Sequence, residues 1–596
     1  MLVLGVAFAV RLLHLLDFAR LPLFERPTVD AALYVDLARR LAQDFAADEA
    51  FYKPPLYPYL LALAWKLVGA NWFLLRLPGV LFGTATCGVA WWLARRLFGP
   101  RVALLAGLFY AANRIAVYFE GELLEIGLVT LVHTSSLALV LWAGSSGRER
   151  DPAPRWRAAV AGLALGLGTV ARPTLLLFDA VAIAWLGRRA AGPALAGLFL
   201  AVLPVTLHNA AHGGGFVLVS SNLGVNYYLG NNPRANGRIA ASSELPANPA
   251  AAERAARALA EQAEGRALRA SEVSGYWLRR GIAWDLAHPA DALRLFARKL
   301  FFAWNAAEIS DNEDLPGLAH HLRVLRVLPI GMWPLAPLGL VGLVLAPRRR
   351  EVHLLRWFVA AQVASLLPFF VVARFRLPWT PALAVLAAWA TLETLVRLRG
   401  RVAGRGRFFG LLAAAGLFCG LPLFGVRAPV DFSLEYKIAW AYQESGRLDE
   451  ALAWYREAIR REPRDALAHN ALGVLLAERG QDLEGATRSI ETALSLDPAR
   501  TPQYAESLAG VHLRRGDPGA ALRACARGLA ARPDASAERS LRLREAEAQR
   551  ALGNAAAEAR ALTAALAAGL PEPRAAQVRQ RLTEIGSGEN PTASDR

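Results

Sequence analysis

The sequence has little cysteine and little lysine. Its 596 residues include three cysteines, Cys87, Cys419 and Cys525, which are far apart in the chain. Three scattered thiols provide neither a disulfide framework nor a cysteine cluster that would bind zinc. Lysine occurs at four positions among the 67 basic residues, so arginine carries nearly all of the positive charge. A lysine beside a functional motif is therefore an informative residue in this sequence.

Extended polar segments are also rare before residue 430. Hydrophobic residues make up 55% of the sequence and the mean hydropathy is +0.28, which is too apolar for an ordinary soluble protein. We therefore predict an all-α, polytopic membrane domain over 1–428, with about eleven spans. The first apolar run lacks the cleavage site of a removable signal, so we expect it to be retained, and the lack of basic residues before it leaves a start codon further upstream open. The predicted spans are 1–17, 73–95, 102–119, 123–143, 157–171, 174–187, 193–210, 326–346, 353–372, 377–396 and 408–426.

The arginines of this region cluster in short connections between the predicted spans. This is the positive-inside pattern, without a basic patch interleaved with aromatic residues, so the net charge of +17 does not indicate a nucleic-acid partner. The clusters fall on one side only if residues 55–70 do not cross the membrane, and we predict an interfacial or re-entrant helix there. The N-terminus is then cytoplasmic, whereas the loops 18–72 and 211–325 and the C-terminus lie outside.

The composition becomes polar after residue 430, and small residues recur at a fixed interval. Alanine recurs every 35 residues at 451, 486 and 521, and proline does so at 463, 498 and 533. This spacing resembles tetratricopeptide repeats, whose paired helices need small residues where they cross. We predict a repeat domain over 431–585, with a degenerate fourth unit or cap from 538, and a disordered tail over 586–596. A generic helical bundle is the alternative.

The first predicted outer loop contains a carboxylate and a lysine that are candidates for chemistry. Asp30 precedes Tyr34 at helical spacing, so it lies at or near a helix N-terminus, where its carboxylate would serve either as a helix cap or as a base. Lys53 comes directly before two prolines in FYKPPLYP, which also contains Tyr57. An ammonium at a membrane surface is a good partner for a phosphate, although an interfacial lysine can also simply reach toward water.

Further charged residues are predicted on the same outer face. Glu120, Glu122 and Glu125 lie where a span begins, and carboxylates at the edge of the hydrocarbon are costly unless they are used or solvated. Arginines at the outer ends of spans oppose the positive-inside bias, and we expect them to bind an anion. These arginines are Arg172, Arg374 and Arg376.

The second long loop begins with a segment rich in Asn, Gly and Tyr over 220–237. Asn226 and Asn231 in this segment offer neutral hydrogen-bonding groups suited to a sugar or a polar headgroup, although such a segment also builds turns. His208 and His212 are four residues apart and could share a helical face, but no third metal ligand is visible nearby. We predict no metal site and no certain cofactor, and dependence on a divalent metal stays open.

The order of these motifs resembles that of the GT-C glycosyltransferases. The resemblance covers residues 1–400 and rests on the early Asp and Tyr, KPPLYP, RLPGVLFG, the second acidic loop, GLALGLGTVARPT and RFRLPWTPALAVLAA. It is closest to the branch of the protein O-mannosyltransferases and lipid A aminoarabinose transferases. The resemblance implies a membrane enzyme that moves a sugar, with inversion, from a polyprenyl-phosphate donor to an acceptor hydroxyl on the outer face.

The resemblance also implies roles for single residues. Asp30 matches the catalytic aspartate of the first loop, and Lys53 matches the lysine that contacts the carrier phosphate. Glu120 and Glu122 stand where the family has its acidic residue of the second loop. Ala31 and Leu33 depart from the family pattern, so phosphate binding is expected to depend on Lys53, on Arg172 or on Arg374. Tyr34, Tyr57, Asn226, Asn231 and Arg376 complete the expected substrate-binding set.

Other functions remain open at the level of sequence. An oligosaccharide ligase, or a transporter or flippase of a lipid-linked headgroup, would also have many spans, and Asp179 inside a short span fits a transporter better. A scaffold that recruits proteins through its repeats is a third alternative. The predicted location is the inner membrane of a bacterium, with the catalytic face and the repeats in the periplasm. The expected partners are the lipid-linked donor, a protein, lipid or glycan acceptor, and a protein bound to the repeats.

Overall fold

The computed structural model describes residues 1–144, 154–238, 242, 244–246, 248–311, 314–400, 403–426, 433–480 and 482–587. The chain divides into two compact units, Met1–Pro429 and Val430–Arg596. Helices are the regular secondary structure throughout, and the described ranges contain no β-strand beyond two isolated bridges. The predicted all-α class is therefore confirmed for the described residues.

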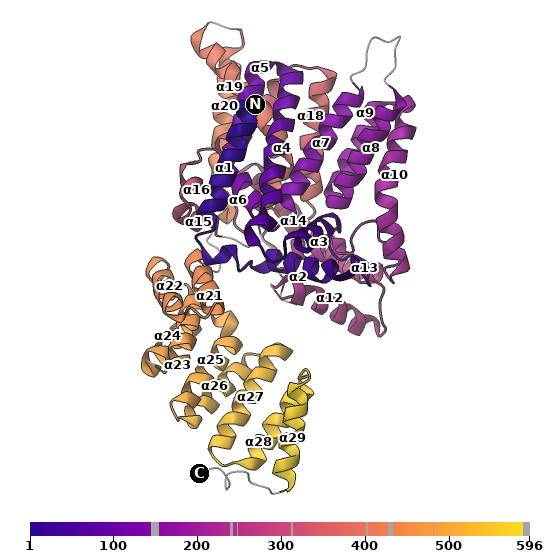
Figure 1. Cartoon of the computed structure of the whole chain (residues 1–596). Helices are drawn as coiled ribbons and strands as arrows, with labels where there is room; N and C mark the ends of the chain where they lie inside the picture. Colours follow the sequence, from indigo (N-terminus) through magenta and orange to yellow (C-terminus); the bar gives the residue numbers. More distant parts are fainter. Residues whose placement is uncertain are drawn as a thin grey trace. The chain divides into compact units, whose positions relative to one another are not determined.

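Each predicted apolar segment of the first unit contains a helix (Figure 1). Among the described residues, four helical segments could cross a membrane by length and composition, at Trp72–Phe98, Ile126–Gly144, Arg188–Ala211 and Ala373–Arg399, or up to five if the bent pair Leu2–Phe18 and Pro22–Asp44 is one span. The other apolar helices are shorter, so the topology of about eleven spans stays a prediction. The helices are α1 (Leu2–Phe18), α4 (Trp72–Phe98), α5 (Pro100–Ala111), α7 (Ile126–Gly144), α8 (Arg155–Ala171), α9 (Leu176–Leu186), α10 (Arg188–Ala211), α17 (Met332–Leu345), α18 (Arg350–Leu366), α19 (Thr380–Arg399) and α20 (Arg405–Gly420).

The predicted span 102–119 is not a single helix. The segment 102–119 is divided between α5 and α6 (Arg114–Gly121), and Asn113 caps α6 by accepting a hydrogen bond from the backbone N–H of Ala116. An Asn cap ends one helix and starts another because its side chain replaces a backbone acceptor. The prediction for 55–70 agrees better, since α3 (Leu56–Val68) has 13 residues and is too short to cross about 30 Å of hydrocarbon.

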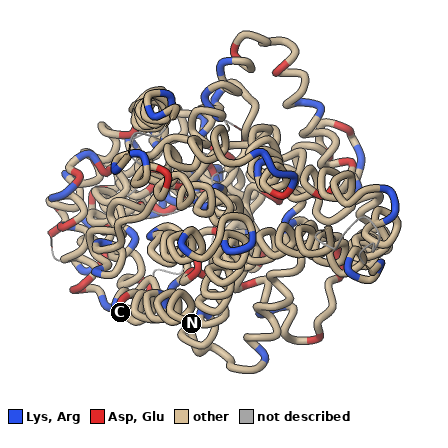
Figure 2. Tube along the Cα trace, turned by 90° about the horizontal axis from the view of Figure 1, so that it is seen from above, with Lys and Arg blue, Asp and Glu red and all other residues tan. Residues whose placement is uncertain are grey.

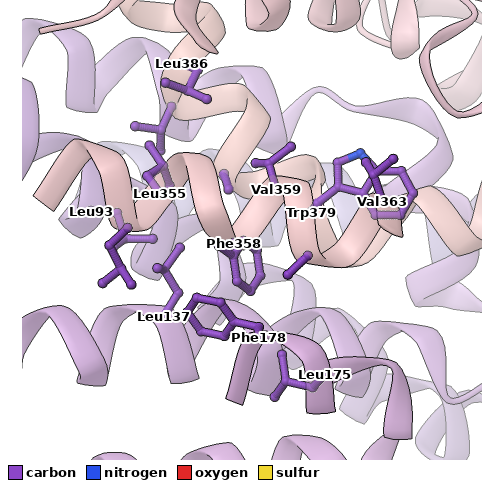
Figure 3. Packing of buried hydrophobic residues seen from close by; sticks show 14 of the residues in the cluster. Leu93, Leu137, Leu175, Phe178, Leu355, Phe358, Val359, Val363, Trp379 and Leu386 are labelled. Carbon is purple, nitrogen blue, oxygen red and sulfur yellow. The ribbon is translucent and has the colours of Figure 1, made fainter. Parts of the chain in front are cut away.

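The core of the first unit forms where α7, α9, α18 and α19 meet. Figure 3 shows Leu137 of α7 and Phe178 of α9 beside Phe358 of α18, and Phe178 meets Phe358 edge to face. Leu386 of α19 belongs to the same cluster. Small residues bring α8 and α10 close together: a Cβ added at Gly162 would lie 1.8 Å from the carbonyl oxygen of Ala194. Such close contact between apolar helices is typical of membrane proteins. Figure 2 shows charged residues as short interruptions in a mostly uncharged trace.

Short helices between the apolar ones carry most of the candidate residues. From the first loop come α2 (Val29–Asp44) and α3, which pack against each other. The long loop forms a helical subdomain in which Tyr228 and Trp277 pack against each other. Its helices and the segments that follow are α11 (Leu223–Gly230), α12 (Pro249–Glu264), α13 (Ala270–Ala287), α14 (Pro289–Trp304), α15 (Leu315–His321), α16 (Arg323–Val327) and the 3₁₀ helix η3 (Ala373–Trp379).

The second unit is a series of paired helices. The repeated alanines Ala451, Ala486 and Ala521 are fully buried, as expected for positions where paired helices cross. The disordered tail was predicted over 586–596, but Gly586 and Ser587 belong to the last helix, and residues 588–596 lie outside the described residues. The helices are α21 (Leu434–Glu444), α22 (Leu448–Arg461), α23 (Ala466–Glu478), α24 (Leu483–Leu496), α25 (Thr501–Arg514), α26 (Pro518–Ala530), α27 (Ala535–Ala551), α28 (Ala555–Ala567) and α29 (Arg574–Ser587).

Candidate active site

Asp30 lies between two cations. Its Oδ1 accepts a hydrogen bond from Lys53 Nζ at 2.6 Å, and its Oδ2 accepts one from Arg374 Nη2 at 2.7 Å. Asp30 is 8% exposed and Arg374 is 6% exposed. The sequence predicted each of these residues as a site residue, and the fold brings them together from three separate segments.

The start of α2 presents the Asp30 carboxylate to this site. Thr28 is the N-cap residue and Asp30 lies in the first turn of α2, so the expected position near a helix N-terminus is confirmed. Val29 has a φ of 50°, in the left-handed region that β-branched residues rarely adopt. Such local strain is concentrated at functional sites, and here it lies directly before the candidate base.

Aromatic rings form one wall of the site. Lys53 Nζ lies 4.9 Å from the centre of the Tyr34 ring, and Tyr34 meets Tyr57 edge to face with 5.2 Å between ring centres. Burial is the main reason why the pKa of the Tyr34 hydroxyl is raised well above its usual value, and the charges of Glu125 and Asp30 raise it further. Tyr34 is therefore neutral and can donate a hydrogen bond.

Arg374 is shared between two carboxylates. Its Nη2 lies 2.7 Å from Oδ2 of Asp311 as well as 2.7 Å from Oδ2 of Asp30. The sequence prediction did not include Asp311, although its position in an acidic stretch of the long outer loop 211–325 was a usable signal. Asp311 belongs to the cluster because η3 returns Arg374 to the loop that follows α14.

Arg172 is the cation of this cluster whose carboxylate partner is farthest away. Its Nη1 lies 3.8 Å from Oε1 of Glu125, and its guanidinium lies 4.2 Å from the centre of the Phe375 ring. That Nη1 is buried and has no hydrogen-bond partner among the described residues. Buried polar atoms are nearly always hydrogen-bonded, so an orphaned guanidinium nitrogen beside a cluster of charges suits an incoming anion.

The three glutamates of the second outer loop have different surroundings. Glu120 accepts hydrogen bonds from Arg11 Nε at 2.6 Å and from the Tyr110 hydroxyl at 2.8 Å, and it is fully buried. A Cβ added at Gly83 would lie 2.1 Å from Glu120 Oε2, so the second glycine of RLPGVLFG makes room for the ion pair of Glu120 and Arg11.

Glu122 and Glu125 also have different partners from each other. Glu122 accepts hydrogen bonds from Arg76 Nη1 at 3.1 Å and from the Tyr118 hydroxyl at 2.8 Å. Glu125 instead faces Arg172 and acts electrostatically on Tyr34 and Arg374. Of the three glutamates, Glu125 is therefore the one that shares its surroundings with Asp30, and the sequence-based choice of Glu120 and Glu122 had not selected it.

A cleft lies beside this cluster, between α3 and α4. Leu60, Leu61 and Phe82 contribute to its apolar walls, and Arg76 and Glu122 also line it. Tyr57 lines the cleft too, and its ring contacts Tyr34 of the charged site. The cleft therefore adjoins the aromatic wall of the charged site.

Other predicted site residues form contacts within the protein. Arg376 donates hydrogen bonds to the backbone carbonyls of Phe302, Asn305 and Ala307 and to the Glu308 carboxylate. These bonds hold the segment after α14 in place.

The two asparagines lie in and directly after α11. Asn231 donates to the carbonyls of Tyr227 and Pro368 and accepts from Lys299 Nζ at 2.8 Å. Asn226 is half-buried in α11, and among the described residues no side-chain hydrogen bond joins it to the Asp30 cluster.

The predicted absence of a metal site stays open to experiment, but candidate ligands are scarce. His208 and His212 stack with ring centres 4.1 Å apart, and His208 also stacks on Phe51. The described ranges contain no group of three or more His, Cys, Asp or Glu residues that could bind a metal ion. Asp179, the residue that favoured a transporter, accepts a hydrogen bond from the Thr169 hydroxyl within the helical core.

Electrostatics decide the protonation state of Asp30. Burial by itself would raise the pKa of its carboxyl, but the Arg374 guanidinium and the Lys53 ammonium outweigh burial and hold this pKa well below its usual range. Asp30 is therefore ionised but weakly basic while both cations contact it. If either cation moved from Asp30 to another anion, the Asp30 carboxylate would become a stronger base.

Two family models match the sequence. Residues 52–206 match the model described as dolichyl-phosphate-mannose-protein mannosyltransferase, and residues 441–480 match a tetratricopeptide repeat. The first match includes Lys53, Glu125 and Arg172. No curated protein matches the chain significantly.

Two solved structures that match this chain have low sequence identity to it. The undecaprenyl-phosphate-bound ArnT from Cupriavidus metallidurans is 17% identical, with 88% of this chain and 79% of that chain covered and a TM-score of 0.35. The oligosaccharyltransferase AglB from Archaeoglobus fulgidus, in complex with an inhibitory peptide and a dolichol-phosphate, is 15% identical. There, 77% of this chain and 58% of that chain are covered, with a TM-score of 0.35.

Proposed function

We propose that the chain is a membrane glycosyltransferase of the GT-C class with tetratricopeptide repeats. In this proposal it moves a sugar from a polyprenyl-phosphate donor to an acceptor hydroxyl, with Asp30 as the base. The observation that carries the proposal is the Asp30 carboxylate shared by Lys53 and Arg374 beside the orphaned Nη1 of Arg172. The matching family is named for a dolichyl-phosphate sugar as donor and a protein as acceptor. This name supports a lipid-linked donor and favours a protein acceptor.

The proposed reaction is an in-line displacement at the anomeric carbon. Asp30 takes the proton of the acceptor hydroxyl, whose oxygen forms a bond to the anomeric carbon as the bond between this carbon and the phosphate oxygen breaks. The configuration is inverted, and the lipid leaves as polyprenyl phosphate. Negative charge grows on the departing phosphate, so cations fixed beside it stabilise the transition state more than the ground state.

The donor phosphate activates Asp30 by competing for its cations. Arg172 offers an orphaned N–H group and makes the first contact, and Lys53 then turns toward the phosphate. Loss of Lys53 from the carboxylate raises the pKa of Asp30, so the base gains strength only when the donor is bound. The cleft between α3 and α4 receives the first isoprene units, and crosslinking of a lipid probe to the opposite face would exclude this placement.

The proposed surroundings of the reaction follow from the distribution of charge. Catalysis takes place at the outer face of a bacterial inner membrane, because the arginine clusters of the connections lie on the other side. The repeats, on the same side as the site, bind the acceptor protein or a partner that delivers it. The oligosaccharide ligase is the second candidate, and it differs by leaving a polyprenyl diphosphate.

Transfer from a panel of donors tests the function. Purified protein in lipid nanodiscs is supplied with radiolabelled polyprenyl-phosphate hexoses and pentoses and with an extract of cell-envelope proteins. We expect label from at least one donor to move to a macromolecule with inverted anomeric configuration. Retained configuration, or label that stays on lipid with every donor, would refute the proposal.

The pH dependence of transfer should separate the free enzyme from the donor complex. In the free enzyme the pKa of Asp30 is depressed, so its carboxyl stays ionised as pH falls through its ordinary value of about 4. We expect kcat/KM to stay flat toward acid, whereas kcat falls at a higher pH because the bound phosphate raises the pKa of Asp30. Steady-state profiles between about pH 4.5 and 8 measure both quantities. Identical acid limbs would contradict the sharing of cations.

Replacement of Glu120 should affect stability rather than the chemical step. Glu120→Gln leaves the buried Arg11 guanidinium without a counter-charge, and breaking such a pair costs about 3–5 kcal/mol. We expect a clear drop in the unfolding midpoint, with transfer per folded molecule nearly unchanged. Thermal unfolding in detergent measures this effect, with the exposed Glu25→Gln as matched control. Lost transfer at an unchanged midpoint would instead make Glu120 part of the catalytic machinery.

A further inference from the structure

The outer side of α14 is apolar, and the described residues of the first unit leave it exposed. Leu293, Phe296 and Leu300 are 70%, 47% and 39% exposed, and Ala297 between them is exposed as well. The spacing of three, four and seven residues places these side chains on one face of the helix. An exposed apolar stripe of this kind is unusual for a surface in contact with water.

The opposite side of α14 is firmly attached to the protein. Leu295, Lys299 and Phe302 are buried, and Lys299 donates a hydrogen bond to Asn231. The helix is therefore a fixed part of the fold, and its outward face is a permanent surface. Arg294 is exposed beside the stripe and Arg298 is half-buried beside it, which gives the flanking basic residues typical of helices that lie at a lipid surface.

The stripe continues onto the end of an apolar helix. Phe301 at the C-terminal end of α14 contacts Phe418 of α20 and Phe424, with 5.5 Å between the ring centres in both pairs. The guanidinium of Arg298 lies 5.6 Å from the centre of the Phe424 ring. Leu417 of α20 is 67% exposed, so the apolar surface runs from α14 onto the side of α20, the last predicted span.

We propose that α14 is an interfacial anchor whose face of Leu293, Phe296 and Leu300 is inserted among the lipids of the leaflet on the side of the active site. Continuity with α20 favours lipid over a protein partner, because the lipid that surrounds a span also covers whatever apolar surface extends from it. Helices of this kind lie parallel to the membrane plane, about 5–10 Å deep at the boundary between headgroups and acyl chains. Arg294 then lies at the level of lipid phosphates.

The anchor has a consequence for the height of the active site. The segment that follows α14 leads to Asp311, and Arg376 of η3 binds the carbonyls of Phe302 and Asn305 at the end of α14. Arg374, two residues away, contacts both Asp311 and Asp30. Lipid insertion of α14 thus holds these charged groups near the level of the leaflet surface.

Spin labels on the full-length protein in lipid nanodiscs test the anchor without any enzymatic assay. The variants Leu293→Cys, Phe296→Cys and Leu300→Cys carry a nitroxide, and Gln262→Cys on the exposed side of α12 is the matched control. The three native cysteines are buried, and treatment of the wild-type chain with the same nitroxide measures any background labelling of them. Size-exclusion elution of each labelled variant verifies that it is folded.

The accessibility of each label to two relaxation agents gives the result. We expect oxygen, which concentrates in the acyl chains, to relax the labels at 293, 296 and 300 more strongly than a water-soluble nickel chelate does. The label at 262 should show the reverse order. Stronger relaxation by nickel at all four sites would place α14 in water. Exclusion of both agents at the three sites would show that protein, such as a second copy of this chain, covers the stripe. Either result would overturn the proposal.

Discussion

Asp30→Asn should lower kcat by about 10²–10⁴-fold, the range that a positioned general base contributes. The amide cannot take a proton from the acceptor hydroxyl, and it keeps the size of the carboxylate but only one of its two acceptor oxygens. KM for the donor should fall or stay constant, because the variant frees Lys53 from the ion pair that competes with the donor phosphate. Initial rates of sugar transfer at saturating donor measure the effect.

A matched control separates catalysis from the general effect of charge on α2. Asp36→Asn removes an exposed carboxylate from the same helix, where its contact with Arg39 is 3.7 Å long. We expect wild-type rates for Asp36→Asn and a folded, monodisperse Asp30→Asn protein. Full transfer by Asp30→Asn would show that its carboxylate serves the fold alone, and Glu125 would then be the next candidate for the base.

Arg172→Gln should lower kcat/KM for the lipid donor by about 10²–10³-fold, the loss typical for one donor to a developing negative charge. Arg172 has an orphaned Nη1 before the donor binds, so its contact with phosphate is a gain in hydrogen bonding that the resting protein lacks. Loss of the guanidinium therefore affects both the binding of the donor and the departure of its phosphate. Steady-state kinetics over a range of donor concentrations measure the effect.

Two further variants make the result for Arg172 specific. Arg172→Lys keeps the charge but loses the forked geometry, so it should recover only part of the activity. Arg20→Gln removes an exposed arginine of the first loop and should leave the kinetics unchanged. An Arg172→Gln enzyme with wild-type kcat/KM would show that the phosphate lies elsewhere, with Lys53 and Arg374 as its remaining partners.

The parts of the site that lie near one another in sequence were predictable. Lysine is rare in this chain, so Lys53 before two prolines was informative, and the helical spacing of Asp30 and Tyr34 correctly indicated the start of α2. The repeat domain could be predicted equally well from the sequence, because its helix crossings require small residues at a constant interval.

Long-range geometry could not be read from the sequence. Arg374 and Arg376 are two residues apart and look alike in RFRLP, yet Arg374 reaches Asp30 whereas Arg376 binds backbone carbonyls after α14. The short turns of η3 decide this difference, and a spacing of two has no fixed meaning in a 3₁₀ segment. Glu120 turns inward in the same way, because Arg11 of α1 offers it a buried partner.

The number of spans shows a second limit of the sequence. Apolar runs located the helices correctly, but Asn113 divides one run and several helices are shorter than the hydrocarbon is thick. Composition indicates that a segment is apolar, whereas caps and packing decide how long its helix is. The number of spans is therefore settled by measuring which loops are accessible on each face of the membrane, rather than by counting apolar runs.

The lipid product of the reaction tests the central claim most directly. Wild-type protein in nanodiscs is incubated with a transferred donor and the acceptor extract, and the lipid is analysed by mass spectrometry and ³¹P NMR. The account predicts one polyprenyl phosphate released for each sugar transferred, and none with Asp30→Asn. Transfer that releases polyprenyl diphosphate, or donor lipid that crosses the bilayer intact without transfer, would contradict it.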